Sequence, residues 1–233
     1  MQEPVAAAIK IARNEGRKIL LENESKPLCE TYGIQTPMSR IASSPNDAAK
    51  AAAGIGFPVA LKVISPDISH KTDAGCVRLG LGNATEVRHA YDEICVNAKR
   101  YNPNVDLRGV LVERLQPEGV EVIVGGLRDP QFGPAVMFGL GGILVELFAD
   151  FSFRVAPLTE PAVKRMIAEV KGYEILKGYR GREPVDQDSL VKIILASSKL
   201  LVDHPEISEM DLNPVILYPK GAVAVDVRIR LAS

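Results

Sequence analysis

Residues 210–229 read MDLNPVILYPKGAVAVDVRI. Two stretches, in which apolar side chains alternate with polar ones at several positions, flank the sequence YPKG. Such alternation is typical of β-strands, and a short connection containing Pro and Gly predicts an antiparallel hairpin. A two-residue turn at positions 219–220 would fix the partner of every residue in the hairpin. A three-residue loop, with Gly221 as a bulge, would shift the register.

Four polar side chains are expected on one face of this hairpin. The two-residue turn pairs Asn213 with Asp226 and Asp211 with Arg228, with opposed Cβ atoms about 5 Å apart. Oxygen atoms of Asn213 and Asp226 could hold one hard cation such as Mg²⁺, completed by water and phosphate oxygens. A cross-strand surface pair beside a salt bridge is the alternative, and Pro214 could bulge the strand and shift the register.

The rest of the chain mixes helical and strand-like periodicity, which predicts an α+β protein. Helices are expected over residues 4–17, 23–33, 45–53, 83–100, 160–170 and 186–204, and further strands over residues 38–42, 58–64, 76–81, 109–115, 120–125 and 135–138. Asn23, Ser44 and Asn83 are the expected N-terminal caps of the second, third and fourth helices. A turn-rich break at residues 102–104 suggests a boundary between lobes. We expect a helical segment over residues 1–22, a first lobe over 23–108 and a second over 109–233.

Composition excludes several classes of protein. The chain has 28 Lys and Arg against 29 Asp and Glu, so its net charge of −1 gives no electrostatic reason to expect nucleic acid or a membrane as partner. The longest uncharged run, residues 131–145, is shorter than the roughly 20 apolar residues that cross a bilayer. No signal peptide is expected, and three distant cysteines fit neither a disulfide framework nor a zinc site. These features indicate a soluble, cytoplasmic protein.

Lys62 lies in the middle of the predicted strand PVALKVI, residues 58–64, between apolar neighbours. The alternation of a strand places it on the face opposite Val59, Leu61 and Val63. Because unpaired burial of an ammonium group costs several kcal/mol, Lys62 must reach the sheet edge or meet an anion such as phosphate. An ordinary solvated edge lysine is the alternative.

His70 lies in the polar loop SPDISHKTDAG, residues 65–75, which has no apolar periodicity to bury it. A neutral imidazole can attack phosphorus and form a reversible phosphoramidate, so His70 is a candidate nucleophile. The alternative is an unremarkable surface histidine. His89 and His204 fit helical patterns and are interpreted as structural or exposed.

Two carboxylates and a glycine cluster complete the candidates. Glu113 and Glu121 lie in strand-like runs, where nucleotide hydroxyl or amino groups could be their partners. Ion pairs with Arg114 or Arg128 are the alternative. The glycine cluster at residues 139–142, GLGG, permits the close backbone approach of a phosphate-binding loop but fits neither the Rossmann nor the P-loop motif.

Taken together, these stretches resemble the ATP-grasp (β) subunit of the NDP-forming acyl-CoA synthetases, the family of ADP-forming acetyl-CoA synthetase, which is related to succinyl-CoA synthetase. The resemblance covers the chain from about residue 20 to residue 231. Its most specific pieces are residues 57–62 (FPVALK), the loop 65–75, residues 125–134 (GGLRDPQFGP), residues 138–142 (FGLGG) with Glu146, and residues 211–214 (DLNP).

The resemblance implies an ATP-grasp fold, in which two α+β lobes sandwich a nucleotide. It places Lys62 at the nucleotide phosphates. Glu113 and the following backbone to Leu115 would lie at the adenine, and Glu121 would bind the ribose hydroxyls.

The same resemblance implies roles in phosphoryl transfer. Asn213 and Asp226 match the family's Mg²⁺ ligands, in agreement with the hairpin geometry, and Arg228 would lie near the transferred phosphoryl group. His70 matches a histidine that is transiently phosphorylated, and Asp211 is a candidate for orienting its imidazole.

The implied reaction is acyl-CoA + ADP + phosphate ⇌ acid + CoA + ATP, catalysed only together with a CoA-binding α subunit, in an expected α2β2 assembly. Two alternatives stay open: an ATP-grasp ligase that forms a free acyl phosphate, and a non-catalytic nucleotide-binding module. One departure is Cys76, where the family more often has glycine. Its side chain could narrow the approach of phosphate or point away.

Overall fold

The computed structural model describes residues 3–141 and 150–232. Contacts group the chain into two compact units. Pro37–Pro117 form one, here called the small unit, and Met1–Thr36 together with Glu118–Ser233 form the other, the large unit.

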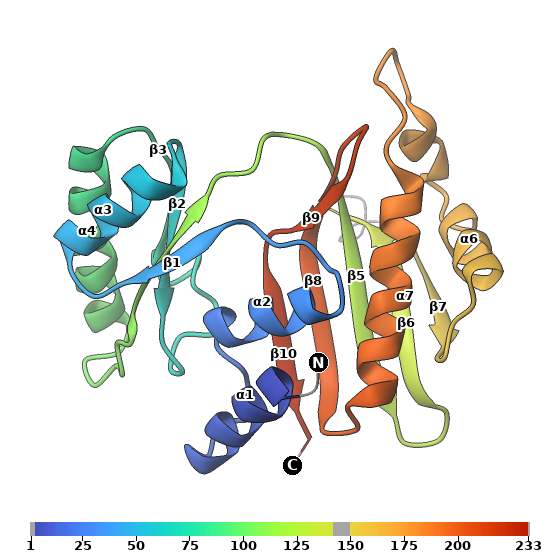
Figure 1. Cartoon of the computed structure of the whole chain (residues 1–233), viewed down its shortest axis with the longest axis horizontal. Coiled ribbons are helices and arrows are strands. Elements are labelled where there is room, and N and C mark those ends of the chain that lie inside the picture. The colour runs from blue at the N-terminus through green and yellow to red at the C-terminus, as the bar shows by residue number, and fades with distance from the viewer. Residues whose placement is uncertain (1–2, 142–149, 233) are drawn as a thin grey trace. The chain divides into compact units, whose positions relative to one another are not determined.

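The small unit is an antiparallel sheet with two helices on one face (Figure 1). The strand order is β1-β4-β2-β3, and the core is made by α3, α4 and the strand residues that face them. Both helices begin at the side-chain caps that the sequence predicts, Ser44 and Asn83, which accept hydrogen bonds from first-turn amides. The elements are β1 (Ser39–Ala42), α3 (Pro45–Ile55), β2 (Val59–Ile64), β3 (Val77–Leu81), α4 (Ala84–Tyr101) and β4 (Gly109–Arg114).

The large unit contains a six-stranded antiparallel sheet of order β10-β8-β5-β6-β7, with β9 also paired to β8. The strands are β5 (Val120–Asp129), β6 (Gly133–Leu140), β7 (Phe151–Val155), β8 (Ile207–Leu217), β9 (Ala222–Ala224) and β10 (Val227–Leu231). The helices are α1 (Glu3–Asn14), α2 (Glu22–Thr31), α6 (Glu160–Ala168), the 3-10 helix η1 (Tyr173–Lys177) and α7 (Gln187–Asp203), which crosses one face of the sheet in Figure 1.

Each sheet has one face that packs against the helices of its own unit. In the large unit, Val122 and Val124 of β5 share a core with residues of α1, α2, α6 and α7, so the odd-numbered residues of β5 point the other way. In the small unit, Val59, Leu61 and Val63 of β2 lie in the core with α3 and α4, as the alternation predicts. None of the described helices of the same unit shares a core with the opposite face of its sheet, which is here called the helix-free face of that unit.

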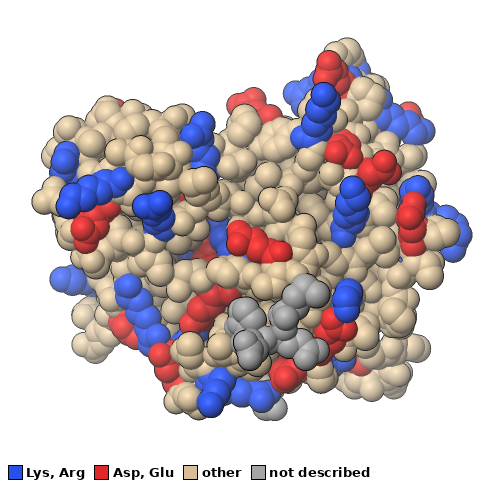
Figure 2. Space-filling view, viewed as in Figure 1, with Lys and Arg blue, Asp and Glu red and all other residues tan. Residues whose placement is uncertain are grey.

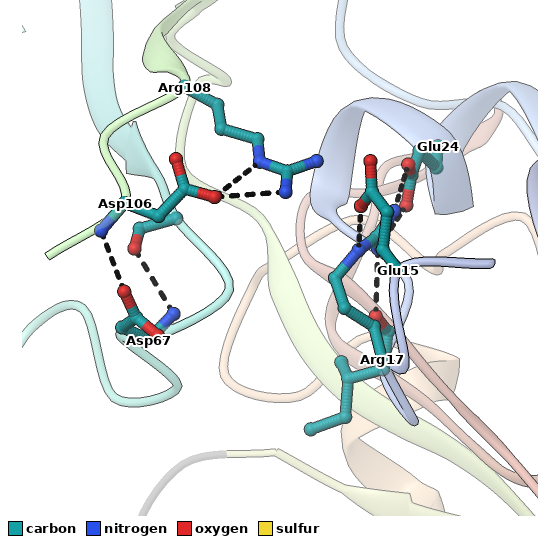
Figure 3. Close-up of polar contacts among 8 residues, drawn as sticks. Glu15, Arg17, Glu24, Asp67, Asp106 and Arg108 are labelled. Atoms are coloured by element: carbon teal, nitrogen blue, oxygen red, sulfur yellow. Dashed lines mark hydrogen bonds and ion pairs between the residues drawn. The ribbon is translucent and has the colours of Figure 1, made fainter. Parts of the chain in front are cut away.

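The observed units differ from the predicted boundaries at residues 22/23 and 108/109. Strand β4 pairs with β1 and β2, so residues 109–114 belong to the small unit. The N-terminal residues belong to the large unit because α2 packs against β10 and the Leu231 amide donates to the Lys18 carbonyl at 2.7 Å. In the same segment, Arg17 binds the carboxylates of Glu15 and Glu24 (Figure 3). Such pairings are tertiary and leave no mark in local hydropathy.

Most predicted helices and strands are confirmed to within a few residues. β7 and η1 were not predicted. The second strand of the C-terminal hairpin, expected over residues 222–229, is two strands, β9 and β10. The predicted cap at Asn23 is wrong: α2 begins after Leu21, whose backbone amide donates to the N3 side chain, Glu24.

The surface carries charges of both signs, as the near-zero net charge predicts. Lys and Arg side chains interleave with Asp and Glu over the face shown in Figure 2. All three cysteines are free. Within the described ranges, no helix combines the length and the apolar character that crossing a membrane requires.

Candidate functional site

Lys62 and Glu113 form a buried ion pair in the small unit. The Lys62 Nζ lies 2.8 Å from the Glu113 Oε1, and the two residues are 6% and 2% exposed. The strand register pairs Lys62 with Leu111 and Ala60 with Glu113, so the two charged residues are diagonal neighbours on the helix-free face. In the folded chain the anion that Lys62 meets is the Glu113 carboxylate, and the burial of Lys62 excludes the solvated edge lysine. A contact of Lys62 with phosphate stays a prediction.

The backbone after Glu113 is tied to the start of β2. The Leu115 amide donates to the Pro58 carbonyl at 3.1 Å, and the Arg114 guanidinium donates to the Ile55 carbonyl, also at 3.1 Å. These contacts fix the segment that the resemblance assigns to adenine beside the strand that carries Lys62.

His70 lies exposed in a loop that is anchored by its flanks. On one flank, Ile68 is buried in the small-unit core and the Asp67 carboxylate accepts the Asp106 amide at 2.7 Å, with Asp106 in turn paired to Arg108 (Figure 3). The ring is therefore open to a reaction partner while the base of the loop is held.

The other flank of the loop is held from helix α4. The Asn97 side chain donates to the Gly75 carbonyl at 2.8 Å, and Gly75 has a φ of +64°, a conformation that favours glycine. Asp67 and Asn97 were not among the sequence candidates, because nothing local marks a polar side chain as an anchor for a distant loop. Cys76, by contrast, is fully buried in the small-unit core, with its thiol near the carbonyls of Ala74 and Ile94.

The hairpin of the large unit has the predicted register. Arg228 pairs with Asp211, the Asn213 amide donates to the Asp226 carbonyl at 3.2 Å, and the Tyr218 amide closes a two-residue turn. In this turn the Tyr218 amide donates to the Gly221 carbonyl at 3.1 Å. The alternative register, with a three-residue loop, is therefore wrong.

Pro214 does bulge the strand, but against β5 and not within the hairpin. Val122 pairs with Val215 and Val124 with Leu212, so two residues of β8 oppose Ile123. As a result, Met210 and Leu212 point into the core before the bulge, and Val215 and Leu217 point into it after the bulge. The hairpin partners of Asp211 and Asn213 are unaffected.

The four polar residues share the helix-free face of the large unit. Leu212, Val227 and Ile229 point into the core, so Asp211 and Arg228, which alternate with them, point the other way. Asp211, Asp226 and Arg228 are half-buried, and Asn213 is exposed.

Electrostatics indicate that this face concentrates negative charge. Burial raises the pKa of the Asp211 carboxyl, the neighbouring carboxylates of Asp226 and Glu209 raise it further, and Arg228 opposes them. A divalent cation would relieve this crowding. Within the described residues, no group of three or more His, Cys, Asp or Glu side chains could hold a metal, so Asn213 and Asp226 would leave most ligand positions to water and phosphate oxygens.

Asp211→Asn is expected to raise the melting temperature at neutral pH by about 2–4 °C. Since the pKa of Asp211 is raised in the folded chain, its ionisation disfavours the native state, and this cost grows as pH rises through the range in which the carboxyl titrates. The gain should therefore shrink in acid, as thermal unfolding at neutral and acidic pH would show. Asp73→Asn, at an exposed position, is the control. Equal gains at both pH values would contradict the prediction.

Glu121 lies exposed on the helix-free side of β5, next to the described part of the glycine cluster. The Gly141 amide donates to the Glu121 carbonyl at 2.9 Å, and a Cβ on Gly141 would lie 3.0 Å from that oxygen. The glycine is thus required by close approach to a neighbouring strand. Gly142 and Glu146 lie outside the described residues. Arg128 donates to carbonyls at the end of α7.

The chain matches the family model described as an ATP-grasp domain over residues 11–231. It is 48% identical over 223 residues to the acetate–CoA ligase [ADP-forming] I subunit beta of Pyrococcus furiosus, with 96% of each chain covered. The chain belongs to this β-subunit family. The resemblance stated from the sequence and the ATP-grasp fold are both confirmed.

Longer relatives contain the same region as one part. The acetate–CoA ligase [ADP-forming] I of Archaeoglobus fulgidus is 44% identical over 95% of this chain, which spans only 32% of that protein. In fused family members, roughly two thirds of the enzyme therefore lies outside the region shared with this chain.

Solved structures of a family member agree with the fold. The dinucleotide-forming acetyl-coenzyme A synthetase 1 of Candidatus Korarchaeum cryptofilum, in complex with coenzyme A, Ca-AMPCP and HgCl+, has a TM-score of 0.94 and 51% identity, covering 96% of this chain and 98% of that chain. A second structure of that enzyme contains Mg-AMPPCP, with a phosphohistidine segment pointing towards the nucleotide-binding site (TM-score 0.87, 47% identity, coverage 98% and 100%).

Proposed function

We propose that this chain is the nucleotide-binding β subunit of a cytoplasmic, heteromeric ADP-forming acyl-CoA synthetase. The reaction is acyl-CoA + ADP + phosphate ⇌ acid + CoA + ATP, with a CoA-binding α subunit as partner in an α2β2 assembly. The observation that carries the proposal is the hairpin register, which brings Asp211, Asn213, Asp226 and Arg228 to one face of the large-unit sheet. This chain belongs to the β-subunit family, in which such residues are expected to bind metal and phosphate.

The large unit supplies the metal and phosphoryl side of the site. Asn213 and Asp226 hold Mg²⁺, which neutralises phosphate charge when bound. Arg228 binds the phosphoryl group in transit, and the pairing with Asp211 holds it on the helix-free face. Glu121, exposed on the same sheet, accepts hydrogen bonds from the ribose hydroxyls.

The small unit supplies the base and phosphate contacts. Lys62 binds the phosphates, and Glu113 and the backbone of Leu115 bind adenine. The 2.8 Å ion pair keeps the Lys62 ammonium in one position, so little side-chain freedom is lost when a phosphate binds.

His70 carries the phosphoryl group between the subunits. A nitrogen of its imidazole attacks phosphorus of the α-subunit phosphohistidine, so one P–N bond forms as another breaks. A β-phosphate oxygen of ADP then displaces His70, which gives ATP and restores the free imidazole. Asp211 is assigned as the carboxylate that orients this ring.

Reconstitution tests the proposal. The chain mixed with its α subunit, an acyl-CoA, ADP, phosphate and Mg²⁺ should form ATP, and omission of the α subunit or addition of EDTA should prevent it. Radioactive phosphate should label this chain in an acid-labile, base-stable form, as a phosphohistidine requires. An acyl-phosphate ligase would give no such label, and a pure binding module would bind ADP without turnover. Either result would contradict the proposal.

A further inference from the structure

Side chains on the helix-free face of the large unit change from polar to apolar across the sheet. The strand registers line up Arg228, Asp211, Gly125, Met137 and Phe153 in one row from β10 to β7. At about 4.8 Å per strand, Phe153 lies roughly 19 Å from Arg228. The charged half of the row contains the proposed phosphoryl site, and the other half has no role in it.

The next row repeats this change. It runs from Arg230 and Glu209 through Leu127 and Ala135 to Val155. Leu127 and Val155 are 41% and 52% exposed, although residues at the centre and edge of a sheet could be polar at no cost to the core. The apolar half is therefore contiguous over two rows.

The turn between β5 and β6 adds an exposed aromatic ring at the edge of these rows. The Asp129 carboxylate accepts the amides of Gln131 and Phe132 at 2.8 and 2.9 Å, and Gly133 has a φ of +78°. In this hydrogen-bonded turn Phe132 is 68% exposed. The turn lies in GGLRDPQFGP, one of the stretches that carried the family resemblance, and none of the roles proposed above falls on its residues.

Together these residues form a groove of about 270 Å³, here called the apolar groove. Its polar rim is Asp129 and Arg154, and its apolar walls are Leu127, Phe132, Ala135, Phe153 and Val155. An apolar centre with a polar rim is the composition of a protein interface.

We propose that the apolar groove docks the α subunit. The argument rests on the proposed function for the identity of the partner. Family members exist both as separate β subunits and as one part of a chain about three times longer, so an enzyme of this family contains protein beyond the region shared with this chain. The groove lies on the same face of the same sheet as Arg228 and Asp211, and a protein that delivers a phosphoryl group there must approach that face.

The test compares two double variants in the full chain. Phe132→Ser/Val155→Ser removes an aromatic ring and a valine from the groove. Tyr179→Ser/Val202→Ser removes the same two kinds of side chain, 54% and 42% exposed, from elsewhere in the large unit. The measurements are the Kd for the purified α subunit by titration calorimetry, the affinity for Mg-ADP, the melting temperature and the self-association of each chain.

The groove variant should bind the α subunit at least about tenfold more weakly than wild type, with unchanged Mg-ADP affinity and melting temperature. The control should bind it like wild type. Equal weakening in both variants, or in neither, would overturn the proposal while leaving the proposed function intact. Loss of self-association alone would assign the groove to a second copy of this chain and also overturn it. Failure of wild type to bind the α subunit would overturn both.

Discussion

His70→Ala is expected to lower ATP formation from acyl-CoA by at least about 10³-fold, because the variant has no imidazole nitrogen at position 70 to accept the phosphoryl group. Its Mg-ADP affinity should stay within about twofold of wild type. His70 is exposed, and its carbonyl accepts the Ala74 amide at 3.1 Å, a contact that alanine retains. A luciferase assay of the reconstituted enzyme and calorimetry with Mg-ADP measure the two quantities.

His89→Ala is the matched control, because His89 is also an exposed histidine of the small unit, on α4. It should keep both turnover and phosphate labelling. Turnover like wild type in His70→Ala would reject the phosphoryl relay. Loss of Mg-ADP binding in that variant would instead show that the loop forms part of the nucleotide site.

Lys62→Met should lower the free energy of unfolding by about 3–5 kcal/mol and abolish measurable Mg-ADP binding. The stability loss follows because the Glu113 carboxylate, 2% exposed, loses the ammonium that offsets its burial. Replacing both charges, in Lys62→Met/Glu113→Gln, should restore most of the stability. Urea unfolding measures the first effect, and calorimetry at a temperature where the variant is folded measures the second.

A second buried pair provides the control. The Lys26 Nζ lies 2.8 Å from the Glu22 Oε1 within helix α2, and both side chains are as buried as Lys62 and Glu113. Lys26→Met should cost similar stability and leave Mg-ADP affinity unchanged in the folded protein. If Lys62→Met bound Mg-ADP normally, its pair would have the same purely structural role as that of Lys26.

The sequence predicts local structure well where the signal lies within a few residues. The caps at Ser44 and Asn83, the alternation around Lys62 and the two-residue turn of the C-terminal hairpin are all confirmed. Strand β7 was missed, because its sequence FSFRV follows residues with no turn signal that would mark its start. The unit boundaries also differ, because β4 takes its partners from strands more than 40 residues earlier in the chain.

Some site chemistry could be anticipated only in part. The sequence shows that Lys62 needs an anion, and only the structure identifies Glu113 as that anion in the folded chain. It places His70 in a polar loop, while the anchors Asp67 and Asn97 come from contacts with residues 106 and 75. Pro214 was expected to disturb the hairpin, but the bulge lies in the pairing of β8 with β5. The sequence of the hairpin does not show that β5 pairs with β8, so it could not predict this.

The sequence by itself determined the family, the elements and the pairing of Asp211 with Arg228, because motifs, caps and a two-residue turn depend on neighbours along the chain. The tertiary structure alone decided that the polar face of the hairpin belongs to the helix-free face of the large unit, and that the apolar groove lies on the same sheet. That outcome depends on the order of the strands and on their mutual register, which hydrogen bonds between distant segments fix only when the sheet forms.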